Sequence, residues 1–134
     1  MSGMVTSVDF DRLNYMTQRP NYRGVHSEHL SALARQIQQL KVIPSDRAPR
    51  NLVTMNSRVR VRDLESDETE VYTLVYPDEA DIEAGRVSAI SPLGRALLGR
   101  RAGEEIEVVA PMGVRRMKIE KVLFQPEAVG HFEL

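Results

Sequence analysis

The chain has 134 residues, of which 42% are hydrophobic and 28% charged, with a formal net charge of −1 and no cysteine. This length supports one core without cross-links, the lack of cysteine excludes thiol catalysis and thiolate zinc sites, and the near-neutral charge argues against a dedicated nucleic-acid binder. We find no apolar run long enough to span a membrane and no signal peptide at the start, so we expect a cytoplasmic protein.

The first third of the sequence predicts two helices joined by a short loop. Thr6 and Asp9 have the spacing of a capping box, and helical spacing of apolar residues then continues until Pro20. In the second helix Leu30, Leu33, Ile37 and Leu40 recur in steps of three and four, which is the seam of a coiled coil. We therefore predict an antiparallel helical hairpin over residues 1–44, packed separately from the rest of the chain.

Residues 45–52 are rich in proline and turn formers, which indicates a linker. After them the period of the apolar residues changes to two, which is typical of strands. Residues 58–64 alternate valine with arginine, and residues 69–76 are β-branched and aromatic, so we predict a hairpin turned at residues 65–68. An acidic loop follows, and residues 86–90 form the next predicted strand.

Ser91 is predicted to cap a short helix that begins at Pro92, with Gly99 after its end in a left-handed conformation. Residues 104–110 and 114–124 then form a second hairpin, turned at residues 111–113. The apolar positions of the last strand change parity, which predicts a bulge near Glu120. Residues 53–134 are thus expected to be an α+β domain, a mostly antiparallel sheet with one short helix.

Few residues suggest chemistry. His26 and His29 flank Glu28, but without a third ligand we interpret them as polar residues at a helix start and expect no metal or other cofactor. Arg58, Arg60 and Arg62 share one strand face, where pairing with acidic side chains of neighbouring strands is the favoured interpretation and docking of an acidic partner the alternative. No catalytic residue is predicted.

Residues 78–122 resemble the C-terminal domain of the Gre-type transcription elongation factors. They combine an acidic turn, a helix that begins with Ser-Pro and contains ALLG, and a Gly-Glu-Glu turn into a strand that ends at Pro and Gly. Residues 53–64 and 73–77 and the tail QPEAVGHFEL resemble the Rnk branch of that family, the regulators of nucleoside diphosphate kinase.

The resemblance implies an N-terminal antiparallel coiled coil and a C-terminal domain like that of the FK506-binding proteins. It also implies docking on core RNA polymerase at the rim of the secondary channel through the Ser-Pro turn, which corresponds here to Ser91, Pro92 and Leu93. Helix capping is the structural alternative for these residues, and both roles can coexist. The tip of the arm corresponds to Arg19, Asn21, Tyr22, Arg23 and His26.

The function implied by the resemblance is that of a non-catalytic regulator that occupies the channel and competes with Gre-type cleavage factors. We expect a monomer that binds polymerase, with no direct specific DNA binding and no membrane contact. Direct binding to nucleoside diphosphate kinase is one alternative. A peptidyl-prolyl isomerase is a weaker one, because only the fold suggests it.

Overall fold

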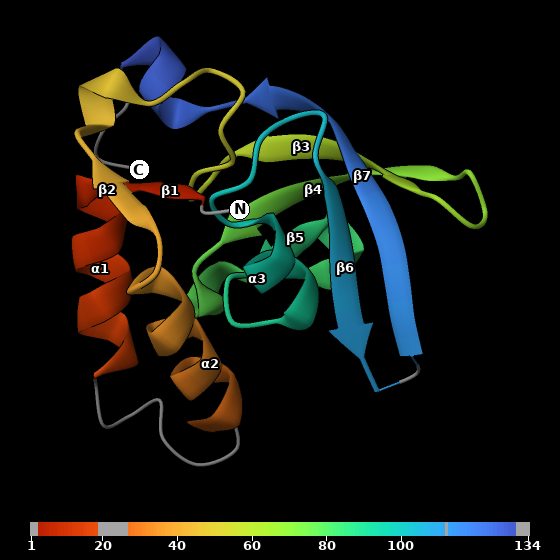
Figure 1. Ribbon diagram of the computed structural model, residues 1–134, viewed down its shortest axis with the longest axis horizontal. Helices are drawn as coiled ribbons and strands as arrows, with labels where there is room; N and C mark the ends of the chain where they lie inside the picture. The colour runs from red at the N-terminus through yellow and green to blue at the C-terminus, as the bar shows by residue number, and fades with distance from the viewer. Residues whose placement is uncertain (1–2, 19–26, 112, 131–134) are drawn as a thin grey trace.

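The computed structural model describes residues 3–18, 27–111 and 113–130. Over these residues the protein is α+β, as the sequence predicts, with three α-helices against a curled, mostly antiparallel sheet (Figure 1). The strand order of this sheet is β5-β4-β3-β7-β6, and β1 and β2 form a separate pair. No helix in the described ranges is both long and apolar enough to cross a membrane.

The N-terminal part contains β1 (Met4–Thr6), α1 (Ser7–Thr17), α2 (Ser27–Ile37) and β2 (Lys41–Ile43). The two predicted helices are confirmed, whereas the strands on either side of them are too short to produce a period-two signal. β1 and β2 pair in parallel, so the helical hairpin is the crossover connection that parallel pairing needs. Figure 1 shows α1 and α2 side by side at one end of the molecule.

The main sheet is built from the two predicted hairpins. β3 (Arg58–Asp63) pairs antiparallel with β4 (Thr69–Val75), and β6 (Glu105–Ala110) pairs with β7 (Gly113–Phe124). β3 and β7 join the hairpins, and their register skips Glu120, which confirms the predicted bulge. β5 (Arg86–Ser88) adds a parallel edge strand beside β4.

Short helical segments connect these strands. The acidic loop forms two 3-10 turns, η3 (Pro77–Glu79) and η4 (Ile82–Ala84), and α3 (Pro92–Leu97) follows β5. Gly99 has φ +80°, the left-handed conformation predicted after this helix. Further 3-10 turns are η2 (Ser45–Arg47) in the predicted linker and η5 (Pro126–Val129) after β7.

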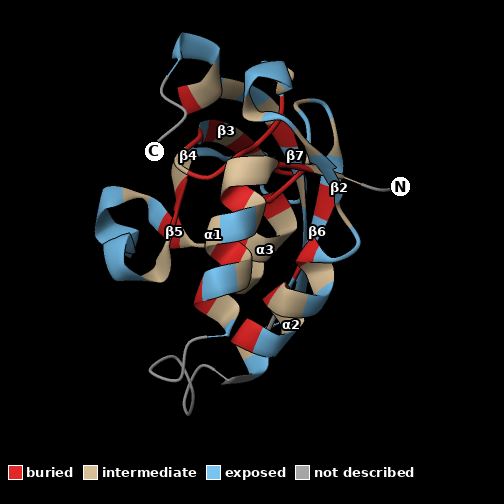
Figure 2. Cartoon of the chain, turned by 90° about the vertical axis from the view of Figure 1, so that its left-hand side faces the viewer, coloured by how far each residue is buried: buried red, intermediate tan, exposed pale blue. Residues whose placement is uncertain are grey.

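The core corrects one expectation. Instead of a hairpin that packs apart from the sheet, the described residues form one buried cluster to which both parts contribute. It joins Leu13 and Met16 of α1, Leu30, Leu33 and Ile37 of α2, Leu97 and Leu98 at α3, and Val59, Val61, Leu74, Ile106 and Ile119 of the sheet. In Figure 2 the buried residues of α1 accordingly recur along one side of the helix.

The seam of α2 therefore packs on the sheet domain as well as on α1. Both helices are short, 11 residues each, and the buried residues of both belong to the same cluster as those of the sheet. The predicted linker also ends inside the domain, where Leu52 is fully buried and bridges to Arg101. The ranges 1–44, 45–52 and 53–134 remain predictions for the limits of the parts.

Candidate docking site

The predicted docking turn is a capped helix start. Ser91 accepts a hydrogen bond at Oγ from the Gly94 N–H at 3.1 Å, and the same hydroxyl donates to the Ser88 carbonyl at 2.7 Å. Pro92 occupies the first turn of α3, where its missing N–H leaves no helical bond unmade. The capping role expected from the sequence is therefore confirmed, and the docking role stays a prediction.

Close backbone contact holds this turn in place. A Cβ added at Gly94 would lie 1.8 Å from the Ser88 carbonyl oxygen, so only glycine fits where α3 crosses the end of β5. Leu93 is half-buried and packs against the core cluster with part of its side chain. Ser91, Pro92 and Leu93 are thus presented at the surface on a rigid support.

A hollow of about 310 Å³ adjoins Pro92. Its walls come from three elements: Gln36 of α2, Pro92, Arg95 and Ala96 of α3, Arg100 after α3, and Glu107 and Val109 of β6. Gln36 donates from Nε2 to the Arg95 carbonyl at 2.7 Å, which ties the hairpin to the helix of the docking turn. Sequence reasoning missed Gln36, because a polar residue on the side of a helix carries no signal of such a distant partner.

Asp9 joins the base of the hairpin to the sheet domain. The Asp9 N–H donates to Thr6 Oγ1 at 3.1 Å, which is half of the predicted capping box. The Asp9 carboxylate accepts the Met55 N–H at 3.0 Å rather than the Thr6 N–H that a capping box requires, so that half of the prediction is wrong. Asp9 has this other partner because folding brings the distant Met55 N–H within hydrogen-bond distance of its carboxylate.

The surroundings of Asp9 favour its neutral form. Burial raises its pKa to about 7, and the charge of Glu127 adds to this effect, while the Met55 N–H, the Thr6 side chain and Arg12 act in the opposite direction. Glu127 in turn accepts from Thr54 Oγ1 at 2.7 Å. The pKa of Tyr76 is also raised, first by burial and then by the Asp9 carboxyl. These residues form one polar junction between α1, the start of the sheet domain and η5.

The predicted arm tip cannot be compared in the same way. The described residues do not include Arg19, Asn21, Tyr22, Arg23 and His26. The pair of His26 and His29 therefore cannot be compared with the structure either. His29 and Glu28 line a shallow hollow with Ser31, Arg35 and Arg95. Within the described ranges, no group of three or more His, Asp or Glu side chains is placed to hold a metal ion.

Two of the three arginines of the stripe, Arg60 and Arg62, are paired as the favoured interpretation predicts. Arg60 Nε lies 3.2 Å from one oxygen of Glu120, and Arg62 Nε lies 2.6 Å from the other. The Arg62 hydrogen bond is the main cause that holds the pKa of Glu120 below its usual range. The bulge of β7 turns Glu120 toward both arginines.

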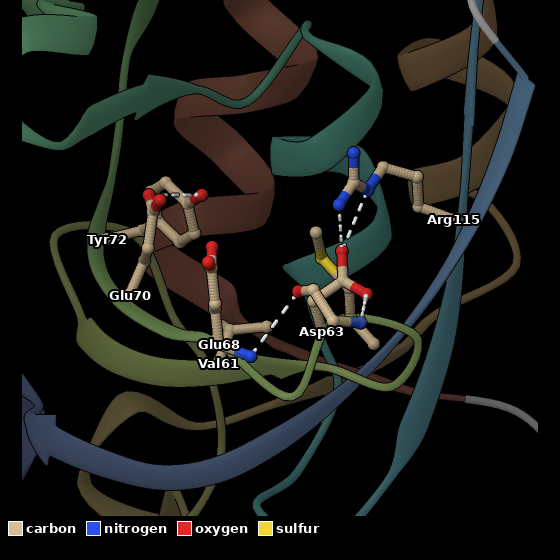
Figure 3. A pocket seen from close by; sticks show the side chains of 8 residues that line it. Val61, Asp63, Glu68, Glu70, Tyr72 and Arg115 are labelled. Carbon is tan, nitrogen blue, oxygen red and sulfur yellow. Dashed lines mark hydrogen bonds and ion pairs between the residues drawn. The ribbon is translucent and has the colours of Figure 1, made fainter.

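A third hollow, of about 260 Å³, lies at the far end of the inner sheet face (Figure 3). Its charged side chains are Asp63, Glu68, Glu70 and Arg115, and its single aromatic ring is Tyr72. Arg115 pairs with Asp63, the main cause of a lowered Asp63 pKa, and the Tyr72 hydroxyl donates to Glu70 at 2.8 Å.

Comparisons with known proteins agree with this architecture. The family described as "Transcription elongation factor, GreA/GreB, C-term" matches residues 48–124. A structure of a GreA/GreB elongation factor from Nitrosomonas europaea has a TM-score of 0.73 at 34% identity, covering 92% of this chain and 99% of that one. Gfh1 of Thermus thermophilus shares the fold, with a TM-score of 0.51 at 17% identity over 92% of this chain and all of that one.

Two curated relatives complete the comparison. The "Regulator of nucleoside diphosphate kinase" of Escherichia coli K12 is 33% identical over 132 residues, 98% of this chain and 96% of that protein. The "Transcription elongation factor GreA" of Nitratidesulfovibrio vulgaris Miyazaki F is 38% identical over 103 residues, 77% of this chain and 64% of the factor. The chain therefore belongs to the GreA/GreB family, with similarity along nearly its whole length to the regulators of nucleoside diphosphate kinase in that family.

Proposed function

We propose that this protein is a non-catalytic transcription regulator that binds core RNA polymerase at the rim of the secondary channel. The observation that carries the proposal is the full-length match to regulators in a family of transcription elongation factors. The capped turn of residues 91–93 supports it, because a rigid, partly apolar projection is suited to docking. The secondary channel is proposed as the binding place because of the resemblance to the Gre-type factors.

The short arm supports the further proposal of competition with Gre-type cleavage factors. Since α2 has 11 residues, its helical length is about 17 Å at 1.5 Å per residue. An arm of this reach can occupy the entrance of a channel and exclude a longer factor without acting at its far end. We extend the proposal to a cytoplasmic monomer that makes no specific DNA contact, and we keep the likeness to FK506-binding proteins and the coiled coil as predictions.

Binding of purified core polymerase to the full chain tests the docking turn. Pro92→Asp places a charge on the turn, yet an acidic residue is compatible with the first turn of a helix, so α3 should persist. Leu93→Asp places the same charge on the half-buried neighbour. We expect both variants to lose at least about tenfold in affinity, because a charge in an apolar contact is strongly unfavourable.

Val129→Asp is the matched control, because Val129 is an exposed valine (58%) on η5, away from the turn. It should bind polymerase as the wild type does. Thermal unfolding of each variant separates loss of docking from loss of folding, which matters most for Leu93→Asp. Wild-type affinity in a folded Pro92→Asp protein would exclude the turn as the docking element.

Direct binding to nucleoside diphosphate kinase is the second candidate function, because the full-length relative bears that name. The same binding assay with purified nucleoside diphosphate kinase in place of polymerase distinguishes the two. Binding to the kinase alone would favour direct regulation. Binding to polymerase alone would favour an indirect effect through transcription. We propose no isomerase activity.

A further inference from the structure

The outer face of the main sheet concentrates positive charge. Arg58, Arg60 and Arg62 point away from the core, because Val59 and Val61 between them are buried. On the neighbouring strand Lys121 lies directly opposite Arg60, and Lys118 directly opposite Arg62. We call these three arginines and two lysines the basic face.

This arrangement is unfavourable for the isolated protein. Like charges directly opposite each other on one sheet face destabilise the strand pairing, and here two such pairs are adjacent. Within the described residues, the ion pairs of the basic face are those of Arg60 and Arg62, with Glu120 and Asp67. Lys118 and Lys121 are exposed and form no ion pair among these residues, although Lys118 also lies directly opposite Glu105 of β6, which pairs with Arg116. The five basic side chains therefore still outnumber the acidic side chains beside them, Glu120, Asp67 and Glu105.

The basic face also contains an exposed apolar side chain, and one carboxylate already bound by its arginines shows the kind of group that the face can bind. Val71 lies directly opposite Arg60 on β4 and is 45% exposed. Glu120 shows that two neighbouring guanidinium groups of this face converge on one carboxylate. Carboxylates beside a small apolar contact are the chemistry of an acidic protein segment.

We propose that the basic face docks an acidic segment of a partner protein, in which Asp or Glu side chains alternate with small apolar ones. α3 packs on the core side of the sheet, so this face is separate from the docking turn of residues 91–93. The inference therefore goes beyond the proposed function and does not depend on it. If α3 binds one partner, the basic face on the opposite side of the sheet stays accessible to a second partner.

The test measures binding of a short fluorescent peptide, in which glutamate alternates with valine, to the full-length protein over a series of salt concentrations. The variant K118E/K121E reverses two charges on the face. The control R47E/R50E makes the same change in net charge at two exposed arginines between β2 and β3. A DNA duplex and a single-stranded RNA are measured in parallel as alternative polyanions.

We expect the wild type to bind the peptide, with an affinity that falls as salt screens the charges. K118E/K121E should weaken binding by about tenfold or more, while R47E/R50E should stay within about twofold of the wild type. Equal peptide binding by K118E/K121E and the wild type, or no binding by either, would overturn the proposal. The proposal would also be overturned if the wild type bound the duplex or the RNA more tightly than the peptide and K118E/K121E abolished that binding. The basic face would then bind nucleic acid. None of these outcomes bears on polymerase docking.

Discussion

The carboxyl group of Asp9 lies where α1 meets the sheet domain, with one oxygen on the Met55 N–H at 3.0 Å. Its other oxygen is buried without a hydrogen-bond partner among the described residues. A buried carboxylate in this position is costly when ionised, which is why its pKa is raised to about 7. The junction of hairpin and sheet therefore includes a group that changes charge near neutral pH.

The pH dependence of stability results from this shift. The pKa of Asp9 is 3.8 in the unfolded chain and about 7 in the folded protein, so the folded state binds more protons between these values. The stability that Asp9 contributes is fully present below pH 3.8 and is lost as the pH rises through about 7. Between these pH values the free energy of unfolding falls by up to about 1.4 kcal/mol per pH unit. Asp9→Asn keeps an acceptor oxygen for Met55 and removes the titration.

We expect urea unfolding to show that the wild type loses stability relative to Asp9→Asn as the pH rises from about 5 to about 8. The comparison between the two proteins is needed because Asp63 and Glu120 have lowered pKa values and act in the opposite direction in both. Parallel pH profiles for the two proteins would mean that Asp9 does not titrate in this range.

At the scale of one element, α3 begins at residues that cap the helix and that we propose as a docking surface. The Ser91 hydroxyl both caps the helix and holds the Ser88 carbonyl at the end of β5. Gly94 allows the close approach that this geometry requires. The orientation of the turn is thus determined by the sheet rather than by the six-residue helix alone.

Two substitutions of Ser91 separate the roles. Ser91→Ala removes the cap and should lower the free energy of unfolding by about 1 kcal/mol, as measured with urea. Ser91→Asp keeps a side-chain acceptor at the cap but loses the hydrogen bond that the hydroxyl donates to the Ser88 carbonyl, so it should stay folded with a free energy of unfolding about 1 kcal/mol below that of the wild type. If the turn docks on polymerase, Ser91→Asp should nevertheless lose binding. A stable Ser91→Asp protein with wild-type affinity would restrict Ser91 to capping.

For the whole molecule, the union of hairpin and sheet into one core has a functional consequence. Gln36 bonds to α3, Asp9 bonds to Met55, and the Met4 N–H of β1 donates to the Gly99 carbonyl after α3. These contacts hold the base of the hairpin against the domain that contains the docking turn. We therefore expect the direction of the arm to be set once the domain is docked.

We predict that the protein does not stimulate transcript cleavage by polymerase. The segment 19–26 at the predicted arm tip contains two arginines and no carboxylate. Mg²⁺ requires oxygen ligands, for which carboxylates supply the charge, so this segment would not stabilise a catalytic metal ion. The measurement uses backtracked elongation complexes with labelled RNA at saturating Mg²⁺.

In that assay the RNA should shorten no faster with the protein than without it. A Gre-type cleavage factor serves as the positive control, and this protein should slow its action when the two are mixed. Faster shortening with this protein alone would contradict the prediction. Unchanged action of the cleavage factor at saturating protein would contradict competition for the same site.

Local patterns in the sequence were sufficient for most elements and for part of the site. The alternation of residues 58–63, the cap at Ser91 and the parity change at Glu120 each depend on neighbours along the chain, and all three are confirmed. The periodicity of α2 likewise shows which of its faces is apolar. These features are determined by the sequence itself, because backbone geometry relates nearby residues in a regular way.

Tertiary structure alone decided what those faces and side chains contact. The apolar face of α2 belongs to the same buried cluster as the sheet and α1, and β1 pairs with β2 across the hairpin. Asp9 bonds to a residue 46 positions away, and Gln36 to one 59 positions away. A period identifies the buried face of an element but not the partner that buries it, since that partner is chosen by how all the elements pack together.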